Sequence, residues 1–193
     1  AEDGSWEHHG GNLRFTDSSG SVIADQLDPQ QFREFIGESV QTSSYLKSPY
    51  YLPMGFPDGI YRVGPLARLN VCERMGVPQA DEELKCFKKL GRGAVTSSFL
   101  YHYARLIEMV HCVERIEQTL ANPVLLETRV RSHASPNHLG GVGCCEAPRG
   151  TLWHQYEVDE NGMVKKANLL IATQQNNGAM QQAVKQAALR FVN

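Results

Sequence analysis

The amino-acid sequence predicts an α+β fold, in which a helical core is accompanied by β-hairpins. Short segments of alternating polar and apolar residues surround turn sequences near both ends of the chain, whereas the centre shows the three- and four-residue spacing of helices. This order of hairpin, helices, hairpin and helix keeps strands and helices in separate runs, which favours α+β over α/β. At 193 residues, the chain is long enough for one sizeable core or two small ones.

The N-terminal third is expected to hold a hairpin, a helix and a loop. Asn12–Asp25 alternates in part and turns at Asp17–Gly20, which is typical of a β-hairpin. An aspartate and a proline then begin a helix over "QQFREFIGESV" (30–40), because they supply an N-cap and a first-turn proline. Ser43–Gly64 combines three prolines and three glycines with four tyrosines, so we expect a packed, irregular loop.

Three helices are predicted in the centre of the chain. "PLARLNVCERM" (65–75) begins with a proline, and "DEELKCFKKL" (81–90) is acidic at its start, basic at its end and closed by Gly91. The longest helix covers 94–122 and stops before a proline. Its apolar residues recur at helical spacing, which predicts one buried stripe. The stripe consists of Phe99, Tyr103, Leu106, Val110, Val113 and Ile116.

A second hairpin and a final helix are predicted towards the C-terminus. "TLWHQYEVDENGMVKKANLLIAT" (151–173) has two β-rich arms around "DENG" (159–162), whose Asn-Gly pair is typical of a hairpin turn. Residues 178–192 form the last predicted helix. The glycine-rich segment before the hairpin is expected to be a turn, with Cys144 and Cys145 as small, mostly buried loop residues.

Charge and hydropathy exclude several classes of function. Lys and Arg number 19 and Asp and Glu 21, so the net charge of −2 gives no electrostatic basis for binding nucleic acid or an anionic membrane. No apolar run approaches the roughly 20 residues of a membrane span. The segment "AEDGSWEHHGG" lacks the basic and apolar regions of a signal peptide. We therefore expect a soluble protein with no membrane span.

The cysteines and histidines favour a reduced, cytoplasmic setting without a zinc finger. The five cysteines form no CxxC pair, and two are adjacent, where a disulfide would be strained. Disulfides are rare in the cytosol, so this pattern fits that compartment. No histidine lies beside a cysteine at zinc-finger spacing. The histidines are His8, His9, His102, His111, His133, His138 and His154.

Several separated segments resemble one protein family. "EAPRGTLWHQYEVDENG" followed by "NLLIATQQNN" is similar to the large subunit of nickel–iron hydrogenases, specifically the cytoplasmic, bidirectional, NAD-linked group. "YLPMGFPDGIYRVGPLARLNVCERMG" and "SSFLYHYARLIEMVHCVERIE" resemble the same group, so the resemblance covers nearly the whole chain. It implies part of the hydrogenase large-subunit fold, in an enzyme that reversibly oxidises H2 with NAD as the coupled cofactor.

The resemblance also implies a role for Arg149, the arginine of "EAPRG". In this family, that arginine lies above a nickel–iron centre whose iron carries carbon monoxide and cyanide. A guanidinium suits the position, because it offers forked, charge-assisted hydrogen bonds to an anionic nitrogen and can stabilise charge as hydrogen splits. Pro148 and Gly150 are expected to restrict the backbone around it. Without the resemblance, a surface or salt-bridged arginine is the simpler interpretation.

Two further residues are implied as neighbours of the centre. Thr173, in "IATQQN", matches the hydroxyl residue that hydrogen-bonds the second cyanide, whereas Ala172 and Gln175 depart from the commoner Pro and Trp in a way that suits the NAD-linked group. Alone, a threonine at a strand end is expected to satisfy a backbone group. Glu146 is expected to pair with Arg149 or with a residue outside this chain, or else to be solvated.

The family's metal ligands are missing from this sequence. They are four cysteines from two CxxC motifs, one near each end of the subunit, and thiolates suit nickel and iron. We therefore expect residues 1–193 to be a single partial domain, the central to C-terminal part of a large subunit. The nickel–iron centre is assigned to the parent protein. The isolated chain is expected to bind no metal, to be inactive, and to self-associate through apolar surface. Candidates for that surface are Tyr50, Tyr51, Phe56, Tyr61, Phe191 and Val192.

The resemblance implies partners and leaves one alternative open. The parent complex would contain a flavin-containing diaphorase and an iron–sulfur small subunit, with H2 as the substrate. The alternative is a non-catalytic scaffold or interaction domain derived from the same fold, as in the related respiratory complex I subunit, which typically carries lysine where Arg149 stands. Arg149 and Thr173 favour the hydrogenase, whereas the missing CxxC motifs keep the scaffold open.

Overall fold

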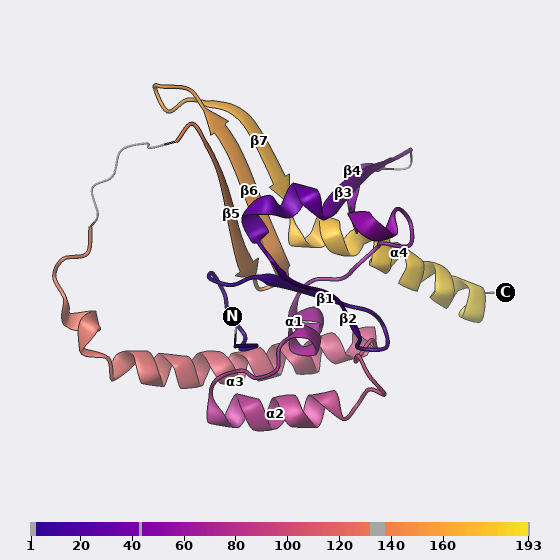
Figure 1. Ribbon diagram of the computed structural model, residues 1–193. Helices are drawn as coiled ribbons and strands as arrows, with labels where there is room; N and C mark the ends of the chain where they lie inside the picture. The colour runs from indigo at the N-terminus through magenta and orange to yellow at the C-terminus, as the bar shows by residue number, and fades with distance from the viewer. Residues whose placement is uncertain (1–2, 43, 132–137, 193) are drawn as a thin grey trace.

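A computed structural model describes residues 3–42, 44–131 and 138–192 (Figure 1). Within these residues, four α-helices accompany three small antiparallel sheets, so the α+β prediction is confirmed. Two sheets are two-stranded hairpins, and the third has three strands in the order β5-β6-β7. The hairpins join neighbours along the chain, which is the arrangement that the turn sequences favour.

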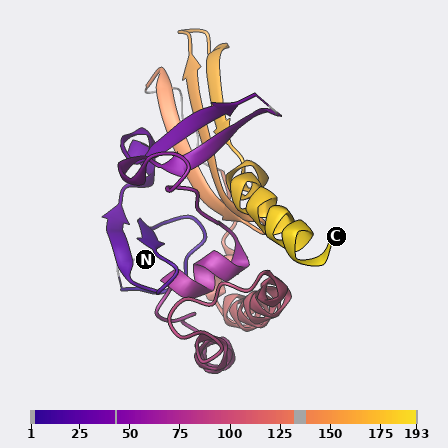
Figure 2. The same cartoon turned by 90° about the vertical axis from the view of Figure 1, so that its right-hand side faces the viewer.

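The helices and the larger sheet form two separate layers. The helical layer contains α1 (Pro65–Val71), α2 (Pro78–Lys88) and α3 (Tyr101–Leu120). The sheet contains β5 (Gly140–Ala147), β6 (Gly150–Val158) and β7 (Val164–Leu170), and α4 (Ala172–Phe191) follows it. Figure 2 shows α2 and α3 nearly end-on, side by side below the sheet, while α4 lies against the sheet's lower end.

The first hairpin is confirmed, but the next two elements differ from the sequence prediction. Strands β1 (Leu13–Thr16) and β2 (Val22–Leu27) pair around the expected turn. The helix predicted over 30–40 is only a 3₁₀ turn at Pro29–Glu34, whose N-cap is the predicted aspartate. Strand β3 (Ile36–Gln41) follows and pairs with β4 (Ser44–Tyr51), which replaces the first part of the predicted loop. The pairing partner supplies hydrogen bonds that local propensity does not reveal.

Helix α3 exists but is shorter than the predicted 94–122, and only Tyr103 and Val110 of the predicted buried stripe pack against the helical core. Its buried residues are Ala104, Ile107, Glu108 and His111, because this side packs against α1 and α2. Leu106, Val113 and Ile116 of the predicted stripe are exposed, and so is Phe99 before the helix. The helix carries apolar residues on two sides, so periodicity alone did not identify the covered one.

The C-terminal hairpin is confirmed and is larger than predicted. The glycine-rich segment is strand β5, paired with β6 from Gly140↔Glu157 to Ala147↔Gly150. Cys144 and Cys145 therefore lie on a strand and are half-buried, not in a loop. Helix α4 begins at Ala172 instead of residue 178.

Two small cores stabilise the two layers. The helical core is formed by Trp6, Leu66, Leu69, Cys72, Met75, Val77, Ala80, Leu84, Phe87, Val95, Ala104 and Ile107. The sheet core is formed by Phe32, Phe35, Ile36, Trp153 and Leu170. A buried arginine of α1 links the two layers, and it contacts the turn that carries the main candidate site residue.

Candidate functional site

The turn between β5 and β6 presents Arg149 at the surface. Ala147 and Gly150 pair across the strands, so Pro148 and Arg149 form a two-residue turn, and both side chains are exposed. Within the described part of the chain, no side chain or backbone group hydrogen-bonds or ion-pairs with the Arg149 guanidinium. Its donors are therefore free to bind an acceptor that is not part of these residues.

The backbone of this turn is fitted closely against the start of α1. Gly150 has a φ of 137°, and a Cβ there would lie 2.4 Å from the Val63 side chain. Gly64 has a φ of 102°, and its Cβ would lie 2.7 Å from the Arg149 carbonyl oxygen. Both positions require glycine on conformational and steric grounds. Gly150 is thus required because the backbone of the turn lies close to Val63 and Gly64, just before α1.

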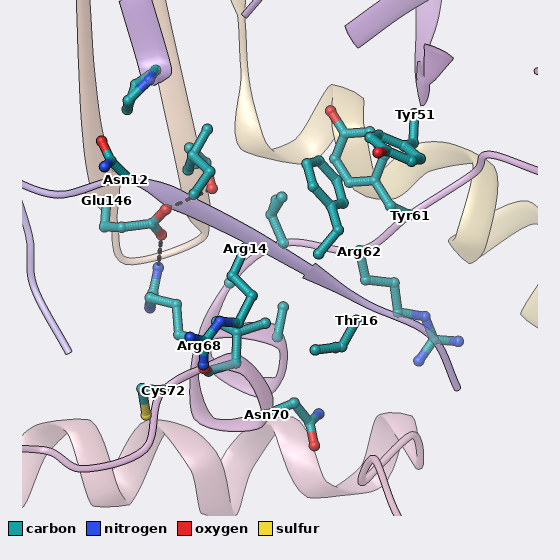
Figure 3. A pocket seen from close by; sticks show the side chains of 18 of the residues that line it. Asn12, Arg14, Thr16, Tyr51, Tyr61, Arg62, Arg68, Asn70, Cys72 and Glu146 are labelled. Carbon is teal, nitrogen blue, oxygen red and sulfur yellow. Dashed lines mark hydrogen bonds and ion pairs between the residues drawn. The ribbon is translucent and has the colours of Figure 1, made fainter. Parts of the chain in front are cut away.

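Glu146 pairs with Arg68, and not with Arg149 as one sequence hypothesis held (Figure 3). Nη1 of Arg68 donates to Glu146 Oε2 at 2.6 Å, and the Thr151 hydroxyl donates to Glu146 Oε1 at 2.6 Å. Nη1 also donates to the Ala147 carbonyl at 2.9 Å. Both oxygens of the carboxylate therefore accept a hydrogen bond at the base of the turn.

Arg68 also binds Glu108 of α3, and sequence reasoning missed this pair. Nε and Nη2 of Arg68 donate to the two Glu108 oxygens at 2.6 and 2.8 Å. Burial lowers the pKa of Arg68, but the hydrogen bonds and charges of Glu108 and then Glu146 raise it above the ordinary value. A charged residue on the buried side of α1 and another on the buried side of α3 could have indicated this pair. Because the sequence prediction placed the buried side of α3 elsewhere, Glu108 was not recognised as buried.

Thr173 lies in the first turn of α4, where it is exposed, and not at a strand end. The buried side chain of Gln175 fixes this turn: Nε2 donates to the Thr151 carbonyl at 2.6 Å, and Oε1 accepts from the Tyr61 hydroxyl at 3.0 Å. Since Thr151 is the second residue of β6, the start of α4 is held beside the strand that follows Arg149. We expect the Arg149 and Thr173 side chains to face one concave surface.

A cavity of about 940 Å³ lies between the β1–β2 hairpin, α1 and the sheet (Figure 3). Its lining includes Arg68, Glu146 and Thr151 together with Tyr61 and Cys72. Burial, and secondarily the charge of Glu38, raises the pKa of Tyr61 well above its ordinary value. Burial likewise raises the pKa of Cys72 to about 12. Both side chains are thus neutral hydrogen-bonding or packing groups here.

The described residues suit donation to an anion and do not form a metal-binding set. No three His, Cys, Asp or Glu side chains in 3–42, 44–131 and 138–192 are grouped so that they could hold a metal ion, and His133 lies outside these ranges. Arg149 and Thr173 instead carry exposed N–H and O–H donors. Their chemistry fits anionic ligands of a metal centre, while the metal itself would need ligands from elsewhere.

Among the helices that the structure describes, none combines the length and apolar character needed to cross a membrane.

Comparison with known proteins places these features in one family. A family profile described as nickel-dependent hydrogenase matches residues 14–190. The chain is 41% identical over 187 residues to a vhu-type F420-non-reducing hydrogenase polypeptide of Methanococcus voltae, covering 97% of this chain and 44% of that protein. It is 35% identical over 190 residues to the beta polypeptide of the NAD-reducing hydrogenase HoxS of Cupriavidus necator, covering 97% of this chain and 39% of that protein.

A solved structure has the same fold over almost the whole chain. The crystal structure of an NAD+-reducing [NiFe]-hydrogenase in the H2-reduced state matches with a TM-score of 0.91 and 41% identity, over 97% of this chain and 42% of that chain. The chain thus spans about two fifths of the length of these relatives. The resemblance inferred from "EAPRG" and the other segments is confirmed: the chain belongs to the nickel-dependent hydrogenase family and has part of the large-subunit fold.

Proposed function

We propose that this chain is one partial domain of the catalytic large subunit of a cytoplasmic nickel–iron hydrogenase that reversibly oxidises H2 coupled to NAD. The family match and the 0.91 TM-score to an NAD+-reducing hydrogenase support this assignment. The single observation that carries it is the exposed, unpaired guanidinium of Arg149, within the described residues, on a turn whose backbone is fixed by α1. Such a group binds an external anion without first losing an internal partner.

Arg149 and Thr173 are assigned as hydrogen-bond donors to the two cyanide ligands of the iron, which also carries carbon monoxide. When bound, the nickel–iron centre supplies the redox chemistry of H2 splitting. Arg149 contributes a fixed positive charge and forked N–H donors, which are stronger where water is excluded. Pro148 limits the turn's conformations, and Glu146 fixes its base through Arg68 and Thr151.

The remaining parts of the catalytic unit come from outside this chain. The cysteine ligands of the metals belong to other segments of the parent subunit. A flavin-containing diaphorase and an iron–sulfur small subunit complete the proposed complex. Relatives named as hydrogenase subunits support the presence of further subunits. The isolated chain is accordingly inactive.

The test replaces Arg149 by lysine in the assembled hydrogenase. Arg149→Lys keeps the charge but loses the planar fork, so we expect a fall of about 100-fold in the H2 oxidation rate and shifted cyanide stretching bands in the infrared. Arg129→Lys, at another exposed arginine, is the matched control and leaves both unchanged. Wild-type rate and bands in Arg149→Lys would remove the assignment. A parent complex without nickel would instead identify the non-catalytic interaction domain.

A further inference from the structure

Arg68 reaches the Arg149 turn from α1 and contacts the strand that leads into it. Nη1 of Arg68 donates to Glu146 Oε2 and to the Ala147 carbonyl, the two residues that precede the turn. Thr151, just after the turn, donates to the other oxygen of Glu146. Strand β5 therefore hydrogen-bonds directly to the Arg68 guanidinium, and β6 is connected to it through Glu146. These hydrogen bonds are 2.6 to 2.9 Å long.

Arg68 is itself held rigidly. Its side chain is only 8% exposed, and Nε and Nη2 are both bound by Glu108 of α3. A forked pair of this kind fixes the plane of the guanidinium as well as its position. The orientation of Nη1 toward the turn thus depends on the packing of α1 against α3.

A second contact couples the turn to the same helix. Gly64, the residue before α1, lies close to the Arg149 carbonyl oxygen. A Cβ at Gly64 would be only 2.7 Å from that oxygen. The turn is consequently held against the beginning of α1 by backbone contact and by Arg68, one helical turn further on. A small displacement of either contact would move the Arg149 side chain, which has no partner of its own among the described residues to restrain it.

We propose that Arg68 is a positioning residue for Arg149: through Glu146, Ala147 and Glu108, it sets where the turn presents its guanidinium. This inference rests on the proposed function, because the position matters only if Arg149 binds the ligands of the metal centre. A displacement of about 1 Å in a positioning group is enough to lower a rate by about 100-fold. Arg68 touches no reacting group and acts through the turn alone.

The experiment compares variants of the assembled hydrogenase with equal nickel content. Lysine at position 68 keeps the charge but cannot bind Glu108 in a fork and reach Glu146 and Ala147 together. For Arg68→Lys, we expect a rate per nickel at least tenfold lower, shifted cyanide bands, and faster amide hydrogen exchange in the peptide containing residues 147–151. Arg14→Lys is the matched control, since Arg14 also binds two carboxylates and a backbone carbonyl but lies in the β1–β2 hairpin. It leaves all three readouts unchanged.

A milder pair of variants keeps the test decisive if Arg68→Lys does not fold. Thr151→Val removes only the hydroxyl donor to Glu146, whereas Thr151→Ser retains it. The valine variant is expected to shift the cyanide bands, and the serine variant to keep them. Bands and exchange rates that stay at wild-type values in both Arg68→Lys and Thr151→Val would overturn the positioning role.

Different results would contradict the positioning role of Arg68 and the proposed function of Arg149. If Arg149→Lys shifts the bands while Arg68→Lys and Thr151→Val do not, only the positioning role is wrong. If Arg149→Lys itself leaves the bands unchanged, the proposed function of Arg149 is wrong, and the role of Arg68 falls with it.

Discussion

Arg68 and Glu108 face each other across the α1–α3 contact, with both carboxylate oxygens bound by one guanidinium at 2.6 and 2.8 Å. The two residues are 40 positions apart, and their side chains are 8% and 10% exposed. Burying two charges costs desolvation free energy, so such a pair tolerates the loss of one partner poorly. The same guanidinium binds Glu146 at the end of β5, which connects the helical layer to the sheet.

The first prediction is that Glu108→Gln destabilises the protein. The change leaves the buried Arg68 charge without its forked partner, so we expect the free energy of unfolding to fall by about 3 kcal/mol. Urea unfolding followed by circular dichroism measures it. Glu82→Gln removes an exposed ion pair with Lys85 and is the control, with no measurable change. Equal effects of the two substitutions would contradict the assignment of a buried, energetically important pair.

The second prediction concerns the pH dependence of stability through His111. Burial, followed by the charges of Arg115 and His8, lowers the pKa of His111 below its ordinary value of 6.5, although Met75 and Glu108 oppose this shift. Below pH 6.5 the unfolded chain binds a proton that the folded chain does not. The stabilisation is therefore fully present above pH 6.5 and is lost as the pH falls through the lowered pKa.

Replacing the histidine should flatten that dependence. We expect the free energy of unfolding of His111→Gln to change less between pH 7 and pH 5 than that of the wild type. His102→Gln, at an exposed position on the same helix, is expected to retain the wild-type slope. Unfolding curves collected at several pH values provide the comparison. A His111→Gln slope equal to the wild-type slope would show that another group is responsible.

The third prediction separates the cysteines by reactivity. Burial raises the pKa of the Cys72 thiol to about 12, and burial together with the Glu146 charge raises that of Cys144 to about 12. Alkylation requires the thiolate, so both should resist iodoacetamide at pH 8 in the folded protein. Cys86 and Cys112 are exposed and should react first. Mass spectrometry of digested protein gives the order, and early labelling of Cys144 would contradict it.

The fourth prediction concerns the exposed side of α3. Five apolar residues recur there at alternating three- and four-residue steps and are 57% to 73% exposed. They are Leu106, Met109, Val113, Ile116 and Leu120. This is the spacing of a helix–helix seam. We expect the isolated chain to self-associate through it, with an average mass in analytical ultracentrifugation that rises with concentration.

A charge on this side should weaken the association. Val113→Lys introduces one positive charge into the seam, and the sedimenting mass is expected to approach that of a monomer. Gln118→Lys adds the same charge on the opposite side of α3 and leaves the association unchanged. Monomeric wild-type chain at all concentrations would contradict the prediction, and in that case the exposed residues would have no packing role in the isolated chain.

The sequence by itself predicted the turns and helix starts that depend only on neighbouring residues. The Asn-Gly turn, the proline at the start of α1 and the helical spacing of the long central helix each depend on residues a few positions apart. These elements exist as predicted, although α3 covers Tyr101–Leu120 and not the whole of 94–122. The "EAPRG" segment and the other matching segments likewise indicated the family. Turn chemistry and helix capping act over short distances, so one segment contains all the necessary information.

Tertiary structure decided the features that depend on distant partners. The pairing of β3 with β4 overrode a helical pattern, and packing on α1 and α2 chose which side of α3 is buried. The same contact brought Glu108 to Arg68 and Arg68 to Glu146, 78 residues away. A buried charge acquires its partner only when two helices and a strand meet. The sequence by itself therefore indicated Arg149, whereas the structure alone revealed what holds the Arg149 turn in place.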